Sequence, residues 1–383
     1  MSMLPLKGVI VLEFCQYLAG PSMGLRLADL GARVIKIEKP GAGDPSRRMS
    51  IKNLWADENS LLFHTINRNK ESFAADLKNP EDLETVKSLI KKADVVTHSF
   101  RPGVMEKLGL DYTTVRRLNE KIIYLEISGY GKKGPWRNKP GQDLLLQSLS
   151  GLAYTSGNHQ DGPVPIGISV VDVFCGVQGA QVILGALVRR QKTGIGAFLE
   201  ISLFESAISM QFELLTTFYN QTGAMKRSSI NNGSPLLGAP YGIYKTADGF
   251  IALAMMDLNM LQTAIGKSIL NGYEIKDAFS HRDEIKKAIA DELLTQSSDY
   301  WMDRLLSHHL WSSKVLNWQE MYSQKAYTDL QMEQWLKLKS GKQFLTTRSP
   351  IRLNQQVHNS HIPAPGLGDH TDIIKQDLLM QDL

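Results

Sequence analysis

The chain has 383 residues, a length that indicates two or three domains and a large core. Hydrophobic residues make up 43% and charged residues 21%, which is an ordinary globular composition. The net charge is only +4 and no block of like charges stands out. Paired basic residues such as Arg47-Arg48 therefore suit a small anionic ligand better than a nucleic acid, and no nucleic-acid partner is expected.

Cysteine usage and the first residues bear on the compartment. The only two cysteines, Cys15 and Cys175, argue against a secreted disulfide scaffold. The opening MSMLPLKGVIVLEF has no basic segment ahead of its apolar run, and Glu13 interrupts that run, so it predicts a strand rather than a signal peptide. No stretch comes near the ~20 uncharged apolar residues of a membrane helix. We expect a cytoplasmic protein with no membrane partner.

The first part of the chain alternates strands with helices. Residues 8–14 (GVIVLEF) predict a buried strand, a helix follows with Pro21 in its first turn, and 32–38 (ARVIKIE) predict a second strand. Further elements follow in the same rhythm: strands at 72–77, 94–100 and 122–130, with a helix at 80–93. This order predicts an α/β fold with an open, mostly parallel, Rossmann-like sheet carrying helices on its faces.

The second part of the chain changes character at residue 226. A long apolar helix follows Asp172 and ends at Gly194, and then come a strand at 197–205 and a helix to about residue 220. The polar segment 226–235 is rich in turn formers, and 242–256 predict an antiparallel hairpin. We therefore predict three parts: 1–225, the N-terminal part of a large nucleotide-fold domain; 226–329, a smaller α+β domain with helices near 258–270, 280–295 and 297–309; and 330–383, a return to the large domain.

Several familiar sites are disfavoured by missing residues. The first β-α-β unit ends at Glu38, as in dinucleotide-binding proteins, but its turn reads QYLAGPSMG and lacks the G-x-G-x-x-G loop, which argues against a nicotinamide or flavin enzyme. No H-E-x-x-H motif is present, and the adjacent His308 and His309 would point to different faces of a helix, so we expect no metal. No G-x-S-x-G nucleophile motif occurs either.

One carboxylate stands out in the otherwise uncharged segment 165–176, PIGISVVDVFCG. A structural interpretation makes Asp172 the N-cap of the following helix, worth ~1 kcal/mol. A functional interpretation makes it a nucleophile, kept ionised by the helix dipole and more reactive because it is shielded from water. The two interpretations are compatible. The apolar neighbours expected to shield it are Ile168, Val170, Val171, Val173 and Phe174.

The residues around Asp172 resemble a known family. The run VPIGISVVDVFCGVQGAQVILGAL is similar to the catalytic segment of the class III CoA-transferases, the formyl-CoA and carnitine CoA-transferase (CaiB/BaiF-like) family. Other segments that resemble this family occur in the right order: 6–47, NRNKESFAADLK at 67–78, 93–112, ISGYGKKGPW at 127–136, GQDLLLQSLSGL at 141–152, 193–206 and APGLGDHT at 364–371. The resemblance is dense to about residue 206 and thin across the middle of the chain.

The resemblance implies a fold, a partner and a mechanism. Members are intertwined homodimers, two chains linked like rings, each with a large nucleotide-fold domain and a smaller domain. The matching residue, Asp172, would attack an acyl-CoA thioester and pass through anhydride and aspartyl-CoA thioester intermediates to a new acyl-CoA. No metal and no cofactor beyond the coenzyme A thioester would be needed. The protein's partners would be an acyl-CoA, a carboxylic acid and a second copy of itself.

The resemblance also implies binding residues. Basic groups after strands would hold the phosphates of coenzyme A. The candidates for this role and for contacts to the rest of the coenzyme are Lys39, Arg101, Phe100, Lys107, Lys132, Arg137 and Tyr130. Gln142, Gln16 and Gly131 are candidates for hydrogen bonds to an acyl or carboxylate oxygen. Their ordinary alternatives are solvated charges, a plain turn and amides bonded to backbone.

Two features bear on the reaction and its substrate. Racemases of the family carry a histidine base where this chain has Gln142, which cannot act as a base, so a 2-methylacyl-CoA racemase is the disfavoured alternative. An inactive CoA-thioester binding protein is a further alternative. Oxalate-type members place a glutamine where this chain has Leu18, and their glycine-rich loop has no match at 252–260. These differences do not favour formate and oxalate, and a bulkier or less polar carboxylate, such as a short dicarboxylic or branched acid, is at least as good a candidate. The sequence does not identify the acids themselves.

Overall fold

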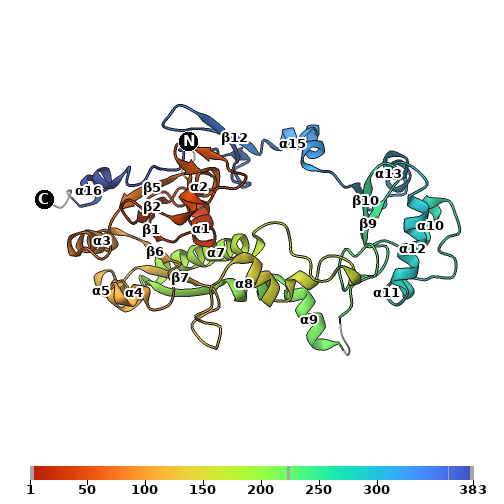
Figure 1. Cartoon of the computed structure of the whole chain (residues 1–383), viewed down its shortest axis with the longest axis horizontal. Helices are drawn as coiled ribbons and strands as arrows, with labels where there is room; N and C mark the ends of the chain where they lie inside the picture. Colours follow the sequence, from red (N-terminus) through yellow and green to blue (C-terminus); the bar gives the residue numbers. More distant parts are fainter. Residues whose placement is uncertain (1–3, 222–224, 361, 380–383) are drawn as a thin grey trace. The chain divides into compact units, whose positions relative to one another are not determined.

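The computed structural model describes residues 4–221, 225–360 and 362–379 (Figure 1). By contacts between residues the chain divides into two compact units. The first is built from the chain up to Leu146, Ser169–Met210 and the chain from Leu330 onward; the second comprises Gln147–Ile168 and Gln211–Asp329. The second unit thus includes a segment before residue 226. The domain boundaries predicted from the sequence remain a prediction.

The first unit is built on a six-stranded parallel sheet. Its strands are β1 (Ile10–Phe14), β2 (Arg33–Glu38), β5 (Lys70–Ala74), β6 (Val95–His98), β7 (Ile123–Ser128) and β8 (Ala197–Ser202). They lie in the order β5-β2-β1-β6-β7-β8, and every neighbouring pair is parallel. In chain order this is 3-2-1-4-5-6, the strand order of dinucleotide-binding folds, which reverses between β1 and β6. The predicted α/β fold with a parallel sheet is confirmed.

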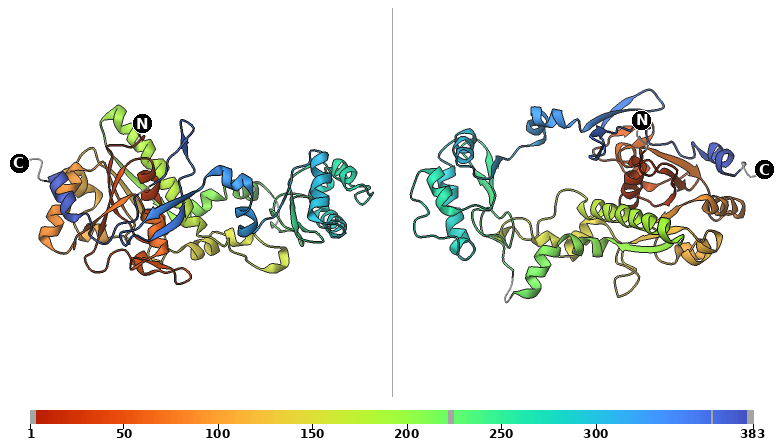
Figure 2. Two further views of the ribbon diagram at one scale, coloured as in Figure 1. Left: turned by 90° about the horizontal axis from the view of Figure 1, so that it is seen from above. Right: turned by 180° about the vertical axis from the view of Figure 1, so that it is seen from behind.

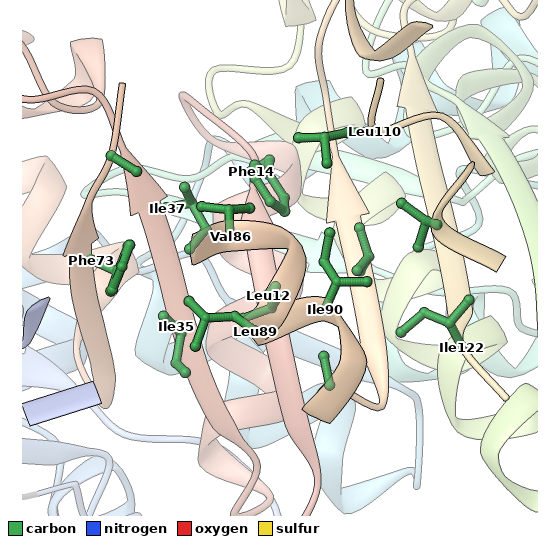
Figure 3. Close-up of a cluster of buried hydrophobic side chains, with 14 of the residues drawn as sticks. Leu12, Phe14, Ile35, Ile37, Phe73, Val86, Leu89, Ile90, Leu110 and Ile122 are labelled. Atoms are coloured by element: carbon green, nitrogen blue, oxygen red, sulfur yellow. The ribbon is translucent and has the colours of Figure 1, made fainter. Parts of the chain in front are cut away.

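One face of the sheet holds a large cluster of buried hydrophobic side chains. Leu12 and Phe14 of β1 and Ile35 of β2 meet α3 (Pro80–Lys92), whose Leu89 lies among them (Figure 3). Helices α4 (Val104–Lys107), α5 (Tyr112–Leu118) and α16 (Thr371–Leu379) contribute to the same cluster. The strands are apolar on consecutive residues because helices cover both faces of a parallel sheet.

The other face carries α1 (Ala19–Asp29) and α7 (Val170–Thr193), which lie side by side (Figures 1 and 2). By length and composition, α7 is the one helix among the described residues that could cross a membrane. The expectation that no segment is as long and as apolar as a membrane-spanning helix is therefore wrong. Its buried residues, including Val171, Gly179 and Ile183, recur at helical spacing and face α1 and the sheet, so its apolarity is that of a core helix.

The chain after residue 330 returns to the first unit. It forms the hairpin of β12 (Glu333–Lys337) and β13 (Gln343–Thr347) and then α16, which packs on α3 and β5. The Gly368 N–H donates to Ser72 Oγ of β5 at 2.9 Å, which fastens the tail to the sheet. The remaining elements of this unit are η1 (Pro45–Arg48), β3 (Trp55–Ala56), β4 (Asn59–Ser60), α2 (Leu61–Asn67), α8 (Leu203–Met210), β14 (Arg352–Leu353) and β15 (Gln356–Val357).

The second unit contains a three-stranded antiparallel sheet. Its strands β9 (Gly242–Lys245), β10 (Phe250–Leu253) and β11 (Ser312–Lys314) lie in the order β11-β10-β9, and the predicted hairpin at 242–256 is confirmed. Its helices are α9 (Phe212–Asn220), α10 (Leu258–Ile265), α11 (Asp277–Ser280), α12 (Arg282–Leu293), α13 (Ser298–Ser307), α14 (Trp318–Tyr322) and α15 (Lys325–Leu330), with short turns η2 (Leu152–Tyr154) and η3 (His159–Asp161). Helix α6 (Asp143–Leu149) begins in the first unit.

Candidate active site

The carboxyl ends of β1 and β6 define the place where a ligand is expected. These strands are neighbours, and Phe14 pairs with His98 at their ends. The turn after β1, Cys15–Leu18, contacts the loop after β6 directly, because the Gln16 N–H donates to Ser99 Oγ at 3.0 Å. In open α/β sheets the strand order reverses at the ligand-binding crevice. Of the residues predicted from the sequence, Gln16 and Leu18 lie in this turn.

Three of the predicted coenzyme A contacts lie at the same edge of the sheet. Lys39 directly follows β2, and Phe100 and Arg101 closely follow β6. Lys39 and Arg101 are exposed, and Phe100 is partly buried and stacks on His98. Lys107, at the end of the short helix α4, is exposed as well. These positions satisfy the geometric expectation for basic groups that hold phosphates after strands.

The loop after β7 carries the other predicted residues. Gly131 is in the left-handed region, with φ +78°, and its N–H donates to Ser128 Oγ at 3.0 Å. The Tyr130 hydroxyl donates to the carbonyl of Pro140 at 3.3 Å, and its ring contacts Trp136. Gln142 and Arg137 are exposed, and the Gln142 carbonyl accepts from two N–H groups in the first turn of α6.

Lys132 differs from the other basic candidates because it is already paired. Its ammonium lies 2.9 Å from Glu126 Oε2 and 3.0 Å from Glu200 Oε1, and it lies over the ring of Phe198. Burial disfavours its charge, but hydrogen bonds and the charges of the two glutamates outweigh burial and raise the pKa of Lys132. A phosphate would have to compete with two carboxylates for this side chain.

Asp172 lies in the first turn of α7, not at its cap. The helix begins at Val170 with Ser169 as N-cap, so the prediction that Asp172 caps the helix is wrong. The capping acceptor comes instead from the start of α6. Asp143 Oδ1 accepts from the N–H of Val171 at 2.7 Å and of Asp172 at 3.2 Å. Sequence reasoning missed Asp143, although it directly follows Gln142 in the G-Q-D motif.

The ionisation of Asp172 is also different from the expectation. Burial, and then the negative charge of Asp143, raise the pKa of Asp172 to about 7. Burial and Asp143 thus act against the helix dipole, which by itself favours the ionised form. Its shielding is incomplete in the isolated chain: Val171 is buried, but Ile168 is 63% exposed and Val173 is 37% exposed. Near neutral pH the group is divided between its acid and its nucleophilic form.

Gly176 allows the start of α7, which carries Asp172, to lie close to the start of α1. A Cβ on Gly176, one helical turn after Asp172, would lie 2.2 Å from Ser22 Oγ and 2.8 Å from the Ala19 carbonyl oxygen. These atoms belong to the first turn of α1, which begins directly after Cys15–Leu18. Only a residue without a side chain permits this approach of the two backbones. The start of α7 thus lies against the start of α1.

A buried group of four charged residues links β1, β2, β5 and the residue before η1; its members are Glu13, Lys36, Lys70 and Asp44. Lys36 Nζ lies 3.0 Å from Glu13 Oε1 and 2.8 Å from Asp44 Oδ2, and Lys70 Nζ lies 2.9 Å from Glu13 Oε2. Burial alone would lower the pKa of Lys36, but the neighbouring carboxylates, Glu13 first, outweigh burial and raise it. The sequence shows Glu13 only as an interruption of an apolar strand and gives no sign of its partners.

Comparisons with known proteins agree with this architecture. The family model described as CoA-transferase family III matches residues 6–371, so the chain belongs to that family. A succinate–glutarate CoA-transferase of Agrobacterium fabrum is 30% identical, covering 96% of this chain and 94% of the relative. A succinyl-CoA:glutarate CoA-transferase of Mus musculus is 29% identical, covering 100% and 88%. The crystal structure of a CaiB/BaiF family protein from Brucella suis is 27% identical with a TM-score of 0.82, covering 98% and 99%.

The chain is therefore an enzyme, a class III CoA-transferase, and the resemblance seen in the sequence is confirmed. The family assignment establishes transfer of coenzyme A as the type of reaction. It does not identify the residue that carries the transferred group or the acids that react.

Proposed function

We propose that this enzyme transfers coenzyme A from an acyl-CoA to a carboxylic acid through covalent intermediates on Asp172. The position of Asp172 carries the proposal: the side chain stands in the first turn of α7, beside the starts of α1 and α6, at the edge where the strand order reverses. A carboxylate with a pKa of about 7 is a stronger base, and so a stronger nucleophile, than an exposed aspartate.

The proposed reaction has four balanced displacements. Ionised Asp172 attacks the thioester carbonyl and releases the coenzyme A thiolate, which leaves a mixed anhydride. The thiolate attacks the aspartyl carbonyl of the anhydride, releases the donor acid and forms an aspartyl-CoA thioester. The acceptor carboxylate attacks that thioester, giving a second anhydride and free thiolate. The thiolate then attacks the acceptor carbonyl, which yields the new acyl-CoA and restores Asp172. No proton, metal or nucleotide is consumed.

The other predicted residues have supporting roles in this proposal. Lys39 and Arg101 would pair with the phosphates of coenzyme A, because a cation beside a phosphate forms short charge-assisted hydrogen bonds. Further contacts to the coenzyme are proposed for Phe100, Lys107, Lys132, Arg137 and Tyr130. The side-chain amides of Gln142 and Gln16 would donate to oxygens that gain negative charge in each displacement, which is where fixed donors lower the barrier most. The Gly131 N–H could do the same only after it leaves Ser128 Oγ, to which it donates in this structure.

We extend the proposal to the acid. Two relatives that align over nearly the whole chain are named for succinate or succinyl-CoA and for glutarate. The sequence, through Leu18 and the segment 252–260, left a short dicarboxylic or a branched acid at least as good a candidate as formate or oxalate. That segment forms the end of β10 and the start of α10. We further propose a homodimer, a cytoplasmic location, and no nucleic-acid, membrane or metal partner.

Trapping the aspartyl intermediate tests the mechanism. Wild-type enzyme incubated with succinyl-CoA and hydroxylamine is expected to carry a hydroxamate on the peptide that contains Asp172, detected by mass spectrometry. Asp172→Ala should lose both the label and transfer to glutarate. The matched control is Asp372→Ala, which removes an exposed carboxylate from the first turn of α16 and should keep both. Transfer at the wild-type rate by Asp172→Ala would refute the mechanism.

The same enzyme preparation separates the alternatives. A racemase would exchange the α-proton of a 2-methylacyl-CoA in deuterated water, and we expect no exchange because Gln142 offers no base. A protein that only binds CoA thioesters would show saturable binding without transfer to any acid in a panel of monocarboxylates and dicarboxylates. The transferase names of its relatives argue against that outcome.

A further inference from the structure

We infer that Asp44 and Lys36 are positioning residues for the transfer reaction, because they hold the Cys15–Leu18 turn in the conformation in which it borders the site. This inference rests on the proposed function, which places the reacting carboxylate at the start of α7, against the helix that this turn begins. Neither residue is proposed to touch the substrate.

The backbone of the turn is held by side chains at three consecutive residues. The Cys15 carbonyl accepts from Lys36 Nζ at 2.8 Å, and the Gln16 N–H donates to Ser99 Oγ at 3.0 Å. The Tyr17 N–H donates to Asp44 Oδ1 at 3.2 Å. The holding groups come from β2, from the loop after β6 and from the segment before η1. Side chains that are distant in sequence therefore hold the turn at three successive residues.

The backbone conformation of the turn at Tyr17 is intrinsically unfavourable. Tyr17 has φ +64°, in the left-handed region that residues with a side chain rarely adopt. A residue in such a conformation costs of order 1 kcal/mol or more, and it persists only where its surroundings fix it. Such strain is concentrated at ligand sites. Here it occurs in the turn between β1 and α1, where the strand order reverses.

The two holding residues act as one buried unit. Lys36 and Asp44 are 0% and 1% exposed, and their charges are 2.8 Å apart. The Asp44 carboxylate also accepts a hydrogen bond from the Ser46 N–H. The backbone N–H of Asp44 donates to Glu38 Oε1. Asp44 thereby also fixes the end of the loop that starts at Lys39, one of the proposed phosphate contacts.

Stability alone does not explain this arrangement. Burying an ion pair costs so much solvation that apolar residues of similar size often stabilise a fold equally well or better. The first unit contains a second buried pair that serves for comparison: Arg68 and Asp29, at the far end of α1 from the turn. The Arg68–Asp29 pair lies at the C-terminal end of α1. The Lys36–Asp44 pair, by contrast, makes hydrogen bonds to the Cys15–Leu18 turn that precedes α1.

The test compares Asp44→Asn with the matched control Asp29→Asn. Each substitution removes one buried negative charge without changing side-chain shape. We expect both to lower the melting temperature by similar amounts. In Asp44→Asn the amide oxygen can still accept from the Tyr17 N–H, but the amide NH2 cannot pair with the Lys36 ammonium that holds the Cys15 carbonyl. With succinyl-CoA and glutarate as probes, kcat should therefore fall by about ten- to hundredfold, because displacing a site by about 1 Å can cost that much. Asp29→Asn should keep kcat within about twofold. Equal losses of kcat, or no loss in Asp44→Asn, would overturn the inference.

A milder variant keeps the test usable if Asp44→Asn does not fold. Ser99→Ala removes only the hydroxyl that holds the Gln16 N–H, and it should lower kcat by at least about threefold; an unchanged kcat would count against the positioning of this turn. Failure of the proposed mechanism gives a different result. In that case Asp172→Ala transfers coenzyme A normally, whereas failure of this inference leaves Asp172→Ala inactive and Asp44→Asn and Ser99→Ala active.

Discussion

The carboxyl group of Asp172 is subject to two opposing requirements. The proposed reaction needs it ionised, whereas burial and Asp143 favour its protonated form and raise its pKa to about 7. In the unfolded chain its pKa would be about 3.9. Because the folded state holds the proton more tightly, the contribution of this group to stability is lost as the pH rises from the unfolded to the folded pKa. Above pH 7 the folded state is therefore destabilised by the ionised carboxylate of this proposed nucleophile.

Asp172→Asn should relieve that cost. At pH 8 the free energy of unfolding is expected to increase by about 2–4 kcal/mol, since each pKa unit corresponds to about 1.4 kcal/mol and the group is only partly buried. Near pH 4, where Asp172 is protonated in the folded state and only about half ionised in the unfolded chain, the difference should fall to about 0.5 kcal/mol. Urea unfolding at the two pH values measures it. Asp372→Asn, on an exposed carboxylate, should show neither effect, and equal stabilisation at both pH values would contradict the assignment.

Asp143 should set the pH range of the reaction. Asp143→Asn removes the negative charge but leaves an amide oxygen to accept from the N–H groups of Val171 and Asp172. With less repulsion the pKa of Asp172 falls. For succinyl-CoA, kcat/KM should rise with pH as Asp172 ionises, and in Asp143→Asn this rise should occur at lower pH. If the pH dependence of kcat/KM is the same in Asp143→Asn and the wild type, Asp143 does not influence the ionisation of Asp172.

The sequence revealed some of these residues and concealed others for physical reasons. Asp172 could be found because a single carboxylate in an apolar segment is conspicuous and its surroundings resemble a family. Asp143 could not be assigned as the cap, because its contact with the start of α7 spans 29 residues of chain. Its effect on the pKa of Asp172 depends on the same contact. A residue's charge state therefore follows from folding, not from local sequence.

At the level of elements, strands were predictable and their assembly was not. The apolar runs at 8–14 and 32–38 identify parallel strands, because both faces of such a sheet are covered. The sequence did not reveal where α7 begins: the helical pattern continues upstream of Asp172, whose N–H is capped from another helix. Nor did it reveal that Glu13, Lys36 and Lys70 pair inside the protein. Glu13 and Lys36 look like isolated charges in apolar strands, and Lys70 lies in the polar run NRNKES.

The crossing of α1 and α7 gives a prediction about a helix pair. In Gly176→Ala the new methyl group would meet Ser22 Oγ and the Ala19 carbonyl, and the carbonyl belongs to backbone that cannot turn aside. Separating the helices should cost about 1–3 kcal/mol and displace Asp172 from the β1 turn, lowering kcat. Thermal unfolding and steady-state transfer measure the two effects.

The same helix offers the matched control. A Cβ on Gly185 would meet nothing within 4 Å, so Gly185→Ala should instead stabilise α7 by about 0.5–1 kcal/mol and leave kcat unchanged. If the two variants behaved alike, the glycine at position 176 would matter only for helix propensity and not for the contact between α1 and α7.

At the scale of the whole molecule, both ends of the chain build the first unit. The strand β1 and the helix α16 share one buried cluster, although more than 350 residues separate them in sequence. The sequence predicted this return near residue 330 from the change back to strands and loops. In sequence, the second unit is therefore inserted in the first: the chain leaves the first unit after Met210 and rejoins it at Leu330.

The family resemblance implies an intertwined homodimer, in which two chains would be linked like rings. Linked chains cannot separate unless one first unfolds the contacts that close it. Mixing a tagged homodimer with an untagged one should therefore give no mixed dimer over days at 25 °C, even at nanomolar concentration. Mixed dimers should form only after both samples are unfolded and refolded together. A homodimer held by surface contacts alone would exchange subunits on dilution, and exchange under native conditions would refute linkage while leaving the proposed chemistry of Asp172 intact.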